Sequence, residues 1–166
     1  MKEVMGNLWD YHDQGLVVVI TTGGLVDRQG RALMPRGCAR QARERFPGVA
    51  KRLGQWIKAQ GNHVYELEPR LVSFPVENSP YECPDLRLIE RSGQELQQLA
   101  NERGWTQIVV PRPGCGGGGL DWRDVRPRLA KWLDDRFLLI CPPSPPAKKR
   151  DSSAKTGVPH EIRKTW

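Results

Sequence analysis

The chain has 166 residues and a mass of 18.8 kDa, which is room for one domain of ordinary size. Its composition, 38% hydrophobic and 27% charged, is that of a globular protein. No apolar run approaches the roughly 20 residues that a membrane-spanning helix needs. The first residues, MKEVMGNLWDYHD, lack the apolar stretch of a signal peptide. We therefore expect a cytoplasmic protein that is neither secreted nor inserted into a membrane.

The net charge of +7 favours a polyanionic partner such as DNA. Most of the excess lies in residues 142–166, which carry six Lys or Arg side chains against two acidic ones, so that +3 remains for residues 1–141. This segment also has five prolines and few apolar side chains. We predict one domain at 1–141 and a Pro-rich basic tail at 142–166 that is disordered. The tail either keeps the protein in solution or docks on nucleic acid.

The four cysteines, Cys38, Cys83, Cys115 and Cys141, are widely spaced and form no CxxC pair. The three histidines supply no zinc-ligand spacing either. The sequence therefore predicts reduced thiols, no metal site and no cofactor.

Glycine and proline divide the first half of the chain into clear segments. The apolar run Leu16–Thr21 predicts a strand buried on both faces, and the polar stretch Thr22–Arg36 predicts a long loop. Helix-forming residues predict helices at Cys38–Phe46 and Val49–Ala59, the second closed by Gly61.

Strands and helices alternate in the second half. Apolar residues recur at helical spacing in Asp85–Arg103, and a helix is also expected at Asp121–Leu133, with Asp121 as its N-cap. The predicted strands are His63–Leu67, Leu71–Phe74, Gln107–Val110 and Phe137–Cys141. This alternation predicts a three-layer α/β/α fold with a parallel or mixed central sheet.

The segment VVPRPGCGGGGLDW, residues 109–122, is the most informative motif. Glycines let the backbone approach a ligand, and successive N–H groups beside a helix start can bind a phosphate or diphosphate. The alternative is a turn that only joins a strand to a helix. No Lys-Ser/Thr pair follows Gly119, which excludes a P-loop, and no acidic residue ends the next strand, as a Rossmann dinucleotide site requires.

A second candidate phosphate loop lies at Thr21–Gly48, where the chain leaves a buried strand, passes several glycines and enters a helix. In a parallel sheet both loops lie at the carboxyl ends of strands, where ligands bind. Two such loops are able to hold a diphosphate from both sides.

The motifs GNLW, VITTGG, ALMPRGCARQARERFPG, FPVEN and VPRPGCGGGGLDW follow one another along the chain. Together they resemble a macro domain, within the branch that contains the DNA ADP-ribosyl hydrolase antitoxins and the terminal ADP-ribose glycohydrolases. The resemblance covers about Lys2–Cys141. It implies a mixed sheet between helices and a cleft for ADP-ribose or an ADP-ribosylated macromolecule.

The resemblance also implies ligand-binding residues. Asn7 stands where many family members have an Asp that contacts adenine. Residues 35–38 match the first phosphate loop, with Pro35 in place of its first glycine, and residues 114–118 match the second. The implied ligand-binding residues are Asn7, Thr22, Gly23, Arg36, Gly37, Cys38, Gly114, Cys115, Gly116, Gly117 and Gly118. Cys115 is also a candidate nucleophile near a helix start, or else a small thiol packed under the loop.

Glu77 occupies the position of the family's catalytic lysine, and Gly118 that of its assisting Asp. A carboxylate cannot act as an amine nucleophile, but it can activate water as a general base, so Glu77 is the candidate catalytic residue. The alternative is a surface carboxylate.

Three functions remain open. The missing lysine favours a module that binds or sequesters ADP-ribose or an ADP-ribosylated target, and a hydrolase that removes ADP-ribose from DNA or protein is the alternative. Charge alone suggests a nonspecific nucleic-acid binder acting through the basic tail. The sequence sets neither the modified target nor the oligomeric state.

Overall fold

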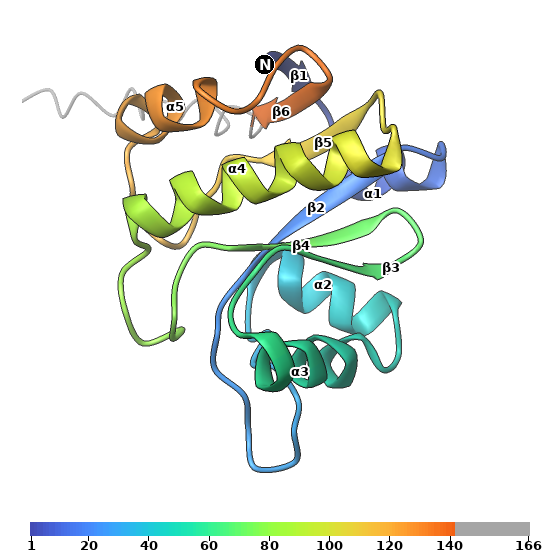
Figure 1. Cartoon of the computed structure of the whole chain (residues 1–166), viewed down its shortest axis with the longest axis vertical. Helices are drawn as coiled ribbons and strands as arrows, with labels where there is room; N and C mark the ends of the chain where they lie inside the picture. Colours follow the sequence, from blue (N-terminus) through green and yellow to red (C-terminus); the bar gives the residue numbers. More distant parts are fainter. Residues whose placement is uncertain (142–166) are drawn as a thin grey trace, which may run out of the picture.

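The computed structural model describes residues 1–141, and the tail predicted at 142–166 lies outside the described residues. The strands are β1 (Lys2–Met5), β2 (Val17–Thr22), β3 (Tyr65–Glu68), β4 (Leu71–Pro75), β5 (Ile108–Pro111) and β6 (Phe137–Cys141). The helices are α1 (Leu8–Asp13), α2 (Gly37–Arg45), α3 (Val49–Gln60), α4 (Leu86–Arg103) and α5 (Trp122–Ala130). The strands form one sheet in the order β1-β6-β5-β2-β4-β3 (Figure 1).

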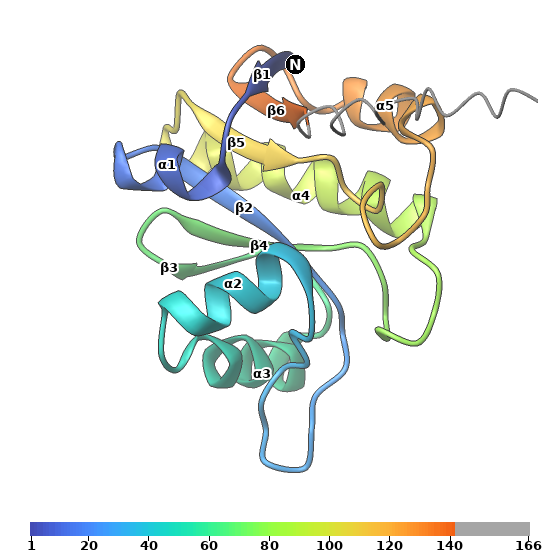
Figure 2. The ribbon, with the colours of Figure 1, turned by 180° about the vertical axis from the view of Figure 1, so that it is seen from behind.

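The helices cover both faces of this sheet. Buried side chains of α1, α2 and α3 form one hydrophobic cluster with the sheet, and those of α4 and α5 form a second. Accordingly, α4 lies in front of the sheet in Figure 1, whereas α1 and α2 lie in front of it in Figure 2. All neighbouring strands are parallel except β3 and β4, which are antiparallel. The predicted three-layer α/β/α fold with a mixed central sheet is confirmed.

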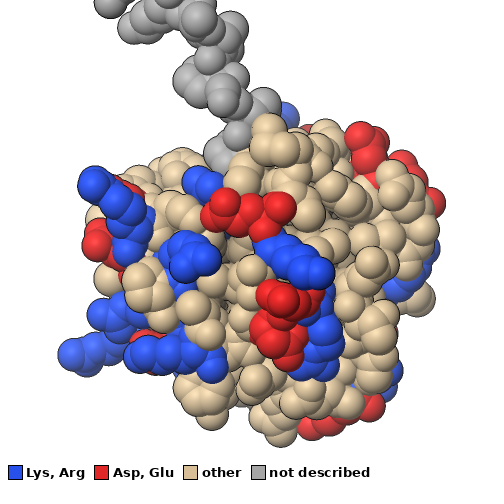
Figure 3. Space-filling view, turned by 90° about the horizontal axis from the view of Figure 1, so that it is seen from above, with Lys and Arg blue, Asp and Glu red and all other residues tan. Residues whose placement is uncertain are grey.

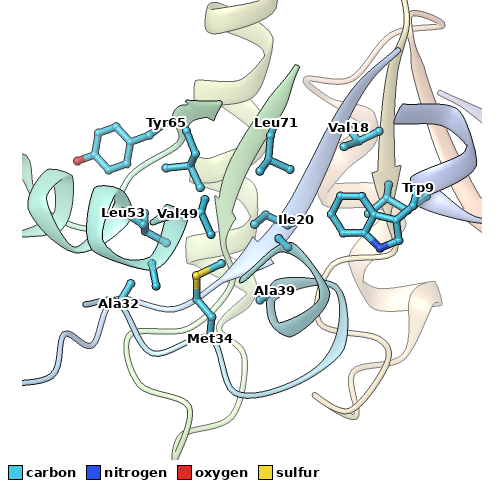
Figure 4. Close-up of a cluster of buried hydrophobic side chains, with 14 of the residues drawn as sticks. Trp9, Val18, Ile20, Ala32, Met34, Ala39, Val49, Leu53, Tyr65 and Leu71 are labelled. Carbon is cyan, nitrogen blue, oxygen red and sulfur yellow. The ribbon is translucent and has the colours of Figure 1, made fainter. Parts of the chain in front are cut away.

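Strand β2 joins the two clusters. It pairs with β4 on one side and β5 on the other, so both of its edges are hydrogen-bonded. Because successive side chains of a strand point to opposite faces, Val18 and Ile20 enter the first cluster and Val17 and Val19 the second. Figure 4 shows Val18 and Ile20 on the face that α2 and α3 cover. This double burial explains the unbroken apolar run from which the strand was predicted.

Helix ends follow the predicted capping residues. The Asp121 carboxylate accepts a hydrogen bond from the backbone N–H of Arg123 at 2.9 Å, as expected of an N-cap. Asp85, expected as the first residue of its helix, is the N-cap of α4 and accepts in the same way from the Arg87 N–H. Gly61 ends α3 with a positive φ of 93°, a conformation that glycine adopts without steric penalty.

Three features depart from the sequence analysis. Neither β1 nor α1 is predicted: β1 is largely exposed and lacks an alternating pattern, and α1 is too short for a helical period to be visible. Helix α5 ends at Ala130, before the predicted end at Leu133. The N–H groups of Trp132 and Leu133 both donate to the Leu129 carbonyl at 2.9 Å, so the last residues tighten into a turn.

No helix within residues 1–141 is long and apolar enough to cross a membrane.

The long loop that follows β2 is held against α3. It contains an isolated antiparallel bridge between Val26 and Ala32, and the Ala32 N–H donates to the Ala50 carbonyl at 2.8 Å. The approach is so close that a Cβ atom on Gly54 of α3 would collide with the Gly30 carbonyl. A glycine in the middle of α3 therefore lets the loop pack directly on the helix backbone.

We expect Gly54→Ala to lower the free energy of unfolding, although alanine favours a helix over glycine by about 1 kcal/mol. The added methyl group has to displace the loop backbone, and overpacking of this kind costs about 1–3 kcal/mol. Denaturant unfolding of the variant measures the difference. The control is Gln55→Ala, at an exposed position of the same helix, which we expect to change stability by less than about 0.5 kcal/mol. A Gly54→Ala variant more stable than the parent would contradict the close packing.

Candidate functional site

The carboxyl ends of β2, β4 and β5 meet at one edge of the sheet, where the loops that follow them enclose a cleft of about 370 Å³. Ligand sites of parallel sheets lie at this edge. The cleft has two glycine-containing walls. One is the start of α2, and the other is the glycine loop, residues 112–119, that leads from β5 to α5.

The first wall is an uncapped helix start. Arg36 is the N-cap of α2 but makes no capping hydrogen bond with its side chain, and the first turn has no acidic residue. Gly37 opens the helix with a φ of 61°, and Gly37, Cys38 and Ala39 line the cleft. No described residue accepts a hydrogen bond from their backbone N–H groups. These donors and the positive end of the helix dipole suit an anion.

The glycine loop forms the second wall. It is closed by a hydrogen bond from the Leu120 N–H to the Gly114 carbonyl at 2.9 Å. Within it the backbone N–H groups of Gly116, Gly117 and Gly118 donate to no other described residue, and all three residues line the cleft. Successive free N–H groups are the arrangement that binds phosphate oxygens.

Most of the predicted site residues come together in this cleft. Those that line it are Thr22, Gly23, Arg36, Gly37, Cys38, Glu77, Gly114, Gly116, Gly117 and Gly118. Asn7 does not line it: its side chain caps α1, accepting a hydrogen bond from the Trp9 N–H at 2.8 Å. Cys115 does not line it either, because its side chain packs against the second hydrophobic cluster.

Two polar residues of β2 face this cleft. Thr22 is buried, and its hydroxyl oxygen has no hydrogen-bond partner among the described residues. The Cys38 sulfur accepts a hydrogen bond from the Thr21 N–H at 3.4 Å and lies 3.5 Å from the Thr21 hydroxyl. Cys38 therefore ties the start of α2 to the central strand.

Glu77 follows β4 and enters the cleft beside Gly23, where its Cγ lies 3.4 Å from the position that a Cβ of Gly23 would occupy. Its side chain is only 13% exposed, and the nearest cation is the Arg36 guanidinium, 4.0 Å away. Burial raises the pKa of Glu77 above its ordinary value; Arg36 opposes this effect and Glu82 adds to it. The Asn62 side chain donates to the Glu77 carbonyl at 3.0 Å and fixes this part of the chain.

Arg112 is a cleft residue that the sequence analysis missed. It follows β5, and its guanidinium lies 4.9 Å from the centre of the Trp122 ring and 3.7 Å from a Glu3 carboxylate oxygen. Its Nε is buried without a hydrogen-bond partner in residues 1–141. The motif quoted for the glycine loop contains this arginine, but only the folded chain brings Glu3 and Trp122 to it.

Charged side chains elsewhere in residues 1–141 pair with one another: His63 and Arg91 both contact Glu95, and Arg103 contacts Glu66. Figure 3 shows basic and acidic side chains next to one another on the face that carries α5, where Arg128 and Lys131 both pair with Glu90. Within residues 1–141, no group of three or more His, Cys, Asp or Glu side chains is placed to hold a metal ion.

Comparison with known proteins gives the fold a name. No protein-family model matches the sequence. Two curated relatives, from Mycobacterium bovis and Mycobacterium tuberculosis, are named DNA ADP-ribosyl glycohydrolase, and each is 32% identical to this chain over 99 residues. The match covers 58% of this chain and 26% of each relative, so the chain spans about a quarter of their length.

Solved structures agree with this similarity. The macrodomain of Thermus aquaticus DarG superposes with a TM-score of 0.68 at 22% identity, over 86% of this chain and 97% of that one. The macrodomain of Mycobacterium tuberculosis DarG gives 0.63 at 22% identity, over 75% and 88%. Thermosipho africanus DarTG in complex with ADP-ribose gives 0.68 at 18% identity, over 85% and 42%. The chain therefore has the macrodomain fold, as the resemblance of its motifs implied.

The thiol environments predict an order of alkylation. Burial raises the pKa of Cys115, and its side chain is partly covered, whereas Cys83 is exposed. Because the thiolate is the reactive form, we expect iodoacetamide to modify Cys83 well before Cys115 at neutral pH, as followed by mass spectrometry of the intact protein and its peptides. Faster modification of Cys115 than of Cys83 would contradict the interpretation of Cys115 as a packed thiol and would favour its interpretation as a nucleophile.

Proposed function

We propose that the cleft binds ADP-ribose, free or attached to a macromolecule. The observation that carries this proposal is the pair of facing walls: the free N–H groups of residues 116–118 on one side and of residues 37–39 on the other. A diphosphate between them would be held by backbone donors from both sides. The relatives named as DNA ADP-ribosyl glycohydrolases and the neighbour in complex with ADP-ribose support this choice of diphosphate ligand.

The orientation of the ligand follows from the two ends of the cleft. Glu77 follows β4 and Arg112 follows β5, on opposite sides of β2. Neighbouring strands are ~4.8 Å apart, so these residues face opposite ends of a bound diphosphate. In the family that this chain resembles, the Glu77 position lies at the distal ribose. The adenosine then lies toward Arg112. At that end Arg112 takes the place of Asn7, which caps α1, as the polar side chain that contacts the adenosine.

Calorimetric titration of the full chain tests the proposal directly. We expect ADP-ribose to bind at least about tenfold more tightly than AMP, a difference of about 1.4 kcal/mol, because AMP offers neither the second phosphate nor the distal ribose to the two walls. ADP is the matched ligand that separates the contribution of the diphosphate from that of the ribose. Equal affinity for ADP-ribose and AMP, or no binding of either, would overturn the proposal.

Gly117→Val tests the glycine loop. A side chain at this position meets only the Arg36 Cδ, at 4.0 Å, so the fold tolerates it while the branched group enters the cleft. We expect at least a tenfold loss of ADP-ribose affinity, with a melting temperature close to that of the parent. Gly118→Val is a poorer test, since its Cβ would lie 2.5 Å from Pro84 and strain the loop itself. Ala59→Val, at an exposed position of α3, is the control, and undiminished affinity of folded Gly117→Val would exclude the loop from the site.

Hydrolysis is the second candidate function, and the position of the Glu77 carboxylate in the cleft favours it. In this case Glu77 acts as a general base on water, and Glu77→Gln lowers the rate by ~10²–10⁴-fold while ADP-ribose affinity is largely kept. The pKa of Glu77 is raised by burial, so the basic form accumulates only above that raised pKa. Activity therefore rises with pH through this value and is lost below it. Release of ADP-ribose from modified DNA and from modified protein measures both effects, and equal activity of the parent and the variant would remove Glu77 from the mechanism.

A further inference from the structure

Glu77 is a mostly covered carboxylate at the wall of the cleft, and no described side chain donates a close hydrogen bond to it. Its side chain is 13% exposed and lines the cleft, and no group in residues 1–141 donates a hydrogen bond to its oxygens. The hydrogen bond from Asn62 to its carbonyl holds the backbone in place, so the side chain stays at the cleft. The Glu77 oxygens are open to the solvent of the cleft, so a cationic group of a bound molecule can replace that water and pair with them.

Arg36 is a weak partner for this carboxylate. Its Nη2 lies 4.0 Å from the Glu77 oxygen, whereas the same nitrogen donates to the Pro80 carbonyl at 3.0 Å, and the arginine side chain is 57% exposed. Its Cδ also lies 4.0 Å from the position that a Cβ of Gly117 would occupy, beside the free N–H groups of the glycine loop. A diphosphate held by that loop offers Arg36 a closer and doubly charged partner, which leaves Glu77 to the rest of the ligand.

We propose that the cleft selects ADP-ribose whose C1″ carbon is bonded to a cationic nitrogen group, the charge of which pairs with Glu77. This inference rests on the proposed function, since it assigns the chemistry at the ribose end of the same site. Two molecules present this chemistry: the pyridinium ring of NAD⁺ and the guanidinium of an arginine side chain that carries ADP-ribose.

The charge of the linked group decides the preference. Free ADP-ribose presents a neutral hydroxyl at C1″, and an ester or an O-glycosidic bond to serine presents a neutral oxygen, so none of them neutralises the carboxylate. A cation near a poorly exposed carboxylate interacts more strongly than the same pair at the surface, because solvent screens it less. Charge-assisted hydrogen bonds from a guanidinium add to this attraction. Free ADP-ribose and NAD⁺ share every other group, which makes them a matched pair of ligands.

Calorimetric titration of the full chain with NAD⁺ and with ADP-ribose tests the inference through the ratio of their affinities. We expect the parent to bind NAD⁺ at least as tightly as ADP-ribose. Glu77→Gln removes the charge without breaking a hydrogen bond, and it should shift the ratio about tenfold toward ADP-ribose. Glu77→Lys reverses the charge and should shift the ratio further in the same direction. Glu102→Gln removes an exposed carboxylate from the last turn of α4, outside the cleft, and should leave the ratio unchanged.

A parent that prefers ADP-ribose about tenfold or more, or a ratio that Glu77→Gln leaves unchanged, would overturn the inference while the proposed function stands. If neither ligand binds, the proposed function itself has failed. Two peptides of one sequence, ADP-ribosylated on arginine or on serine, identify the source of the cation. Preference for the arginine peptide assigns the guanidinium, and preference confined to NAD⁺ assigns the pyridinium of a free dinucleotide.

Discussion

The cleft depends on the burial of β2 on both faces. Because Val17 and Val19 point into one hydrophobic cluster and Val18 and Ile20 into the other, the strand cannot slip by one residue without exchanging its two cores. Its parallel pairing with β4 and β5 then brings three strand ends to one edge of the sheet. The start of α2 and the glycine loop face each other because this register holds the strands in place.

Within the cleft, the backbone and the side chains offer different kinds of interaction to a ligand. The two facing walls present main-chain N–H groups, which carry no net charge and suit anions through their geometry. Charged side chains stand at the two ends, with Glu77 after β4 and Arg112 after β5. In the proposed binding mode, affinity for the diphosphate and selectivity for the linked group therefore come from separate parts of the site. The end that carries Glu77 is also where this chain departs most from the family that its motifs resemble.

The sequence predicts those parts of the molecule that depend on local patterns. The apolar run of β2, the helical spacing of α4 and the capping residues Asp121 and Gly61 are local, and the structure confirms each of them. Strand β1 depends on its pairing with β6, more than a hundred residues away, so no local pattern marks it.

The same limit applies to the site. Glycine loops are visible in a sequence because glycine has a conformational role, and both loops were predicted from it, whereas the individual site residues were implied by the resemblance to a family. Arg112 has no such signal, since its position depends on Trp122 and Glu3, which three-dimensional packing brings together. Asn7 matches its motif position, but it lies outside the cleft lining, where its side-chain oxygen accepts a hydrogen bond from the Trp9 N–H.

The contact between Gly54 and Gly30 has a consequence for the thermodynamics of association. The loop that leads into the first wall is already fixed on α3 by backbone packing and by the hydrogen bond between Ala32 and Ala50. A ligand that enters the cleft does not have to order this loop, so little main-chain entropy is lost on binding. The glycine in the middle of a helix, unfavourable for the helix itself, thus preorganises a wall of the cleft from its far side.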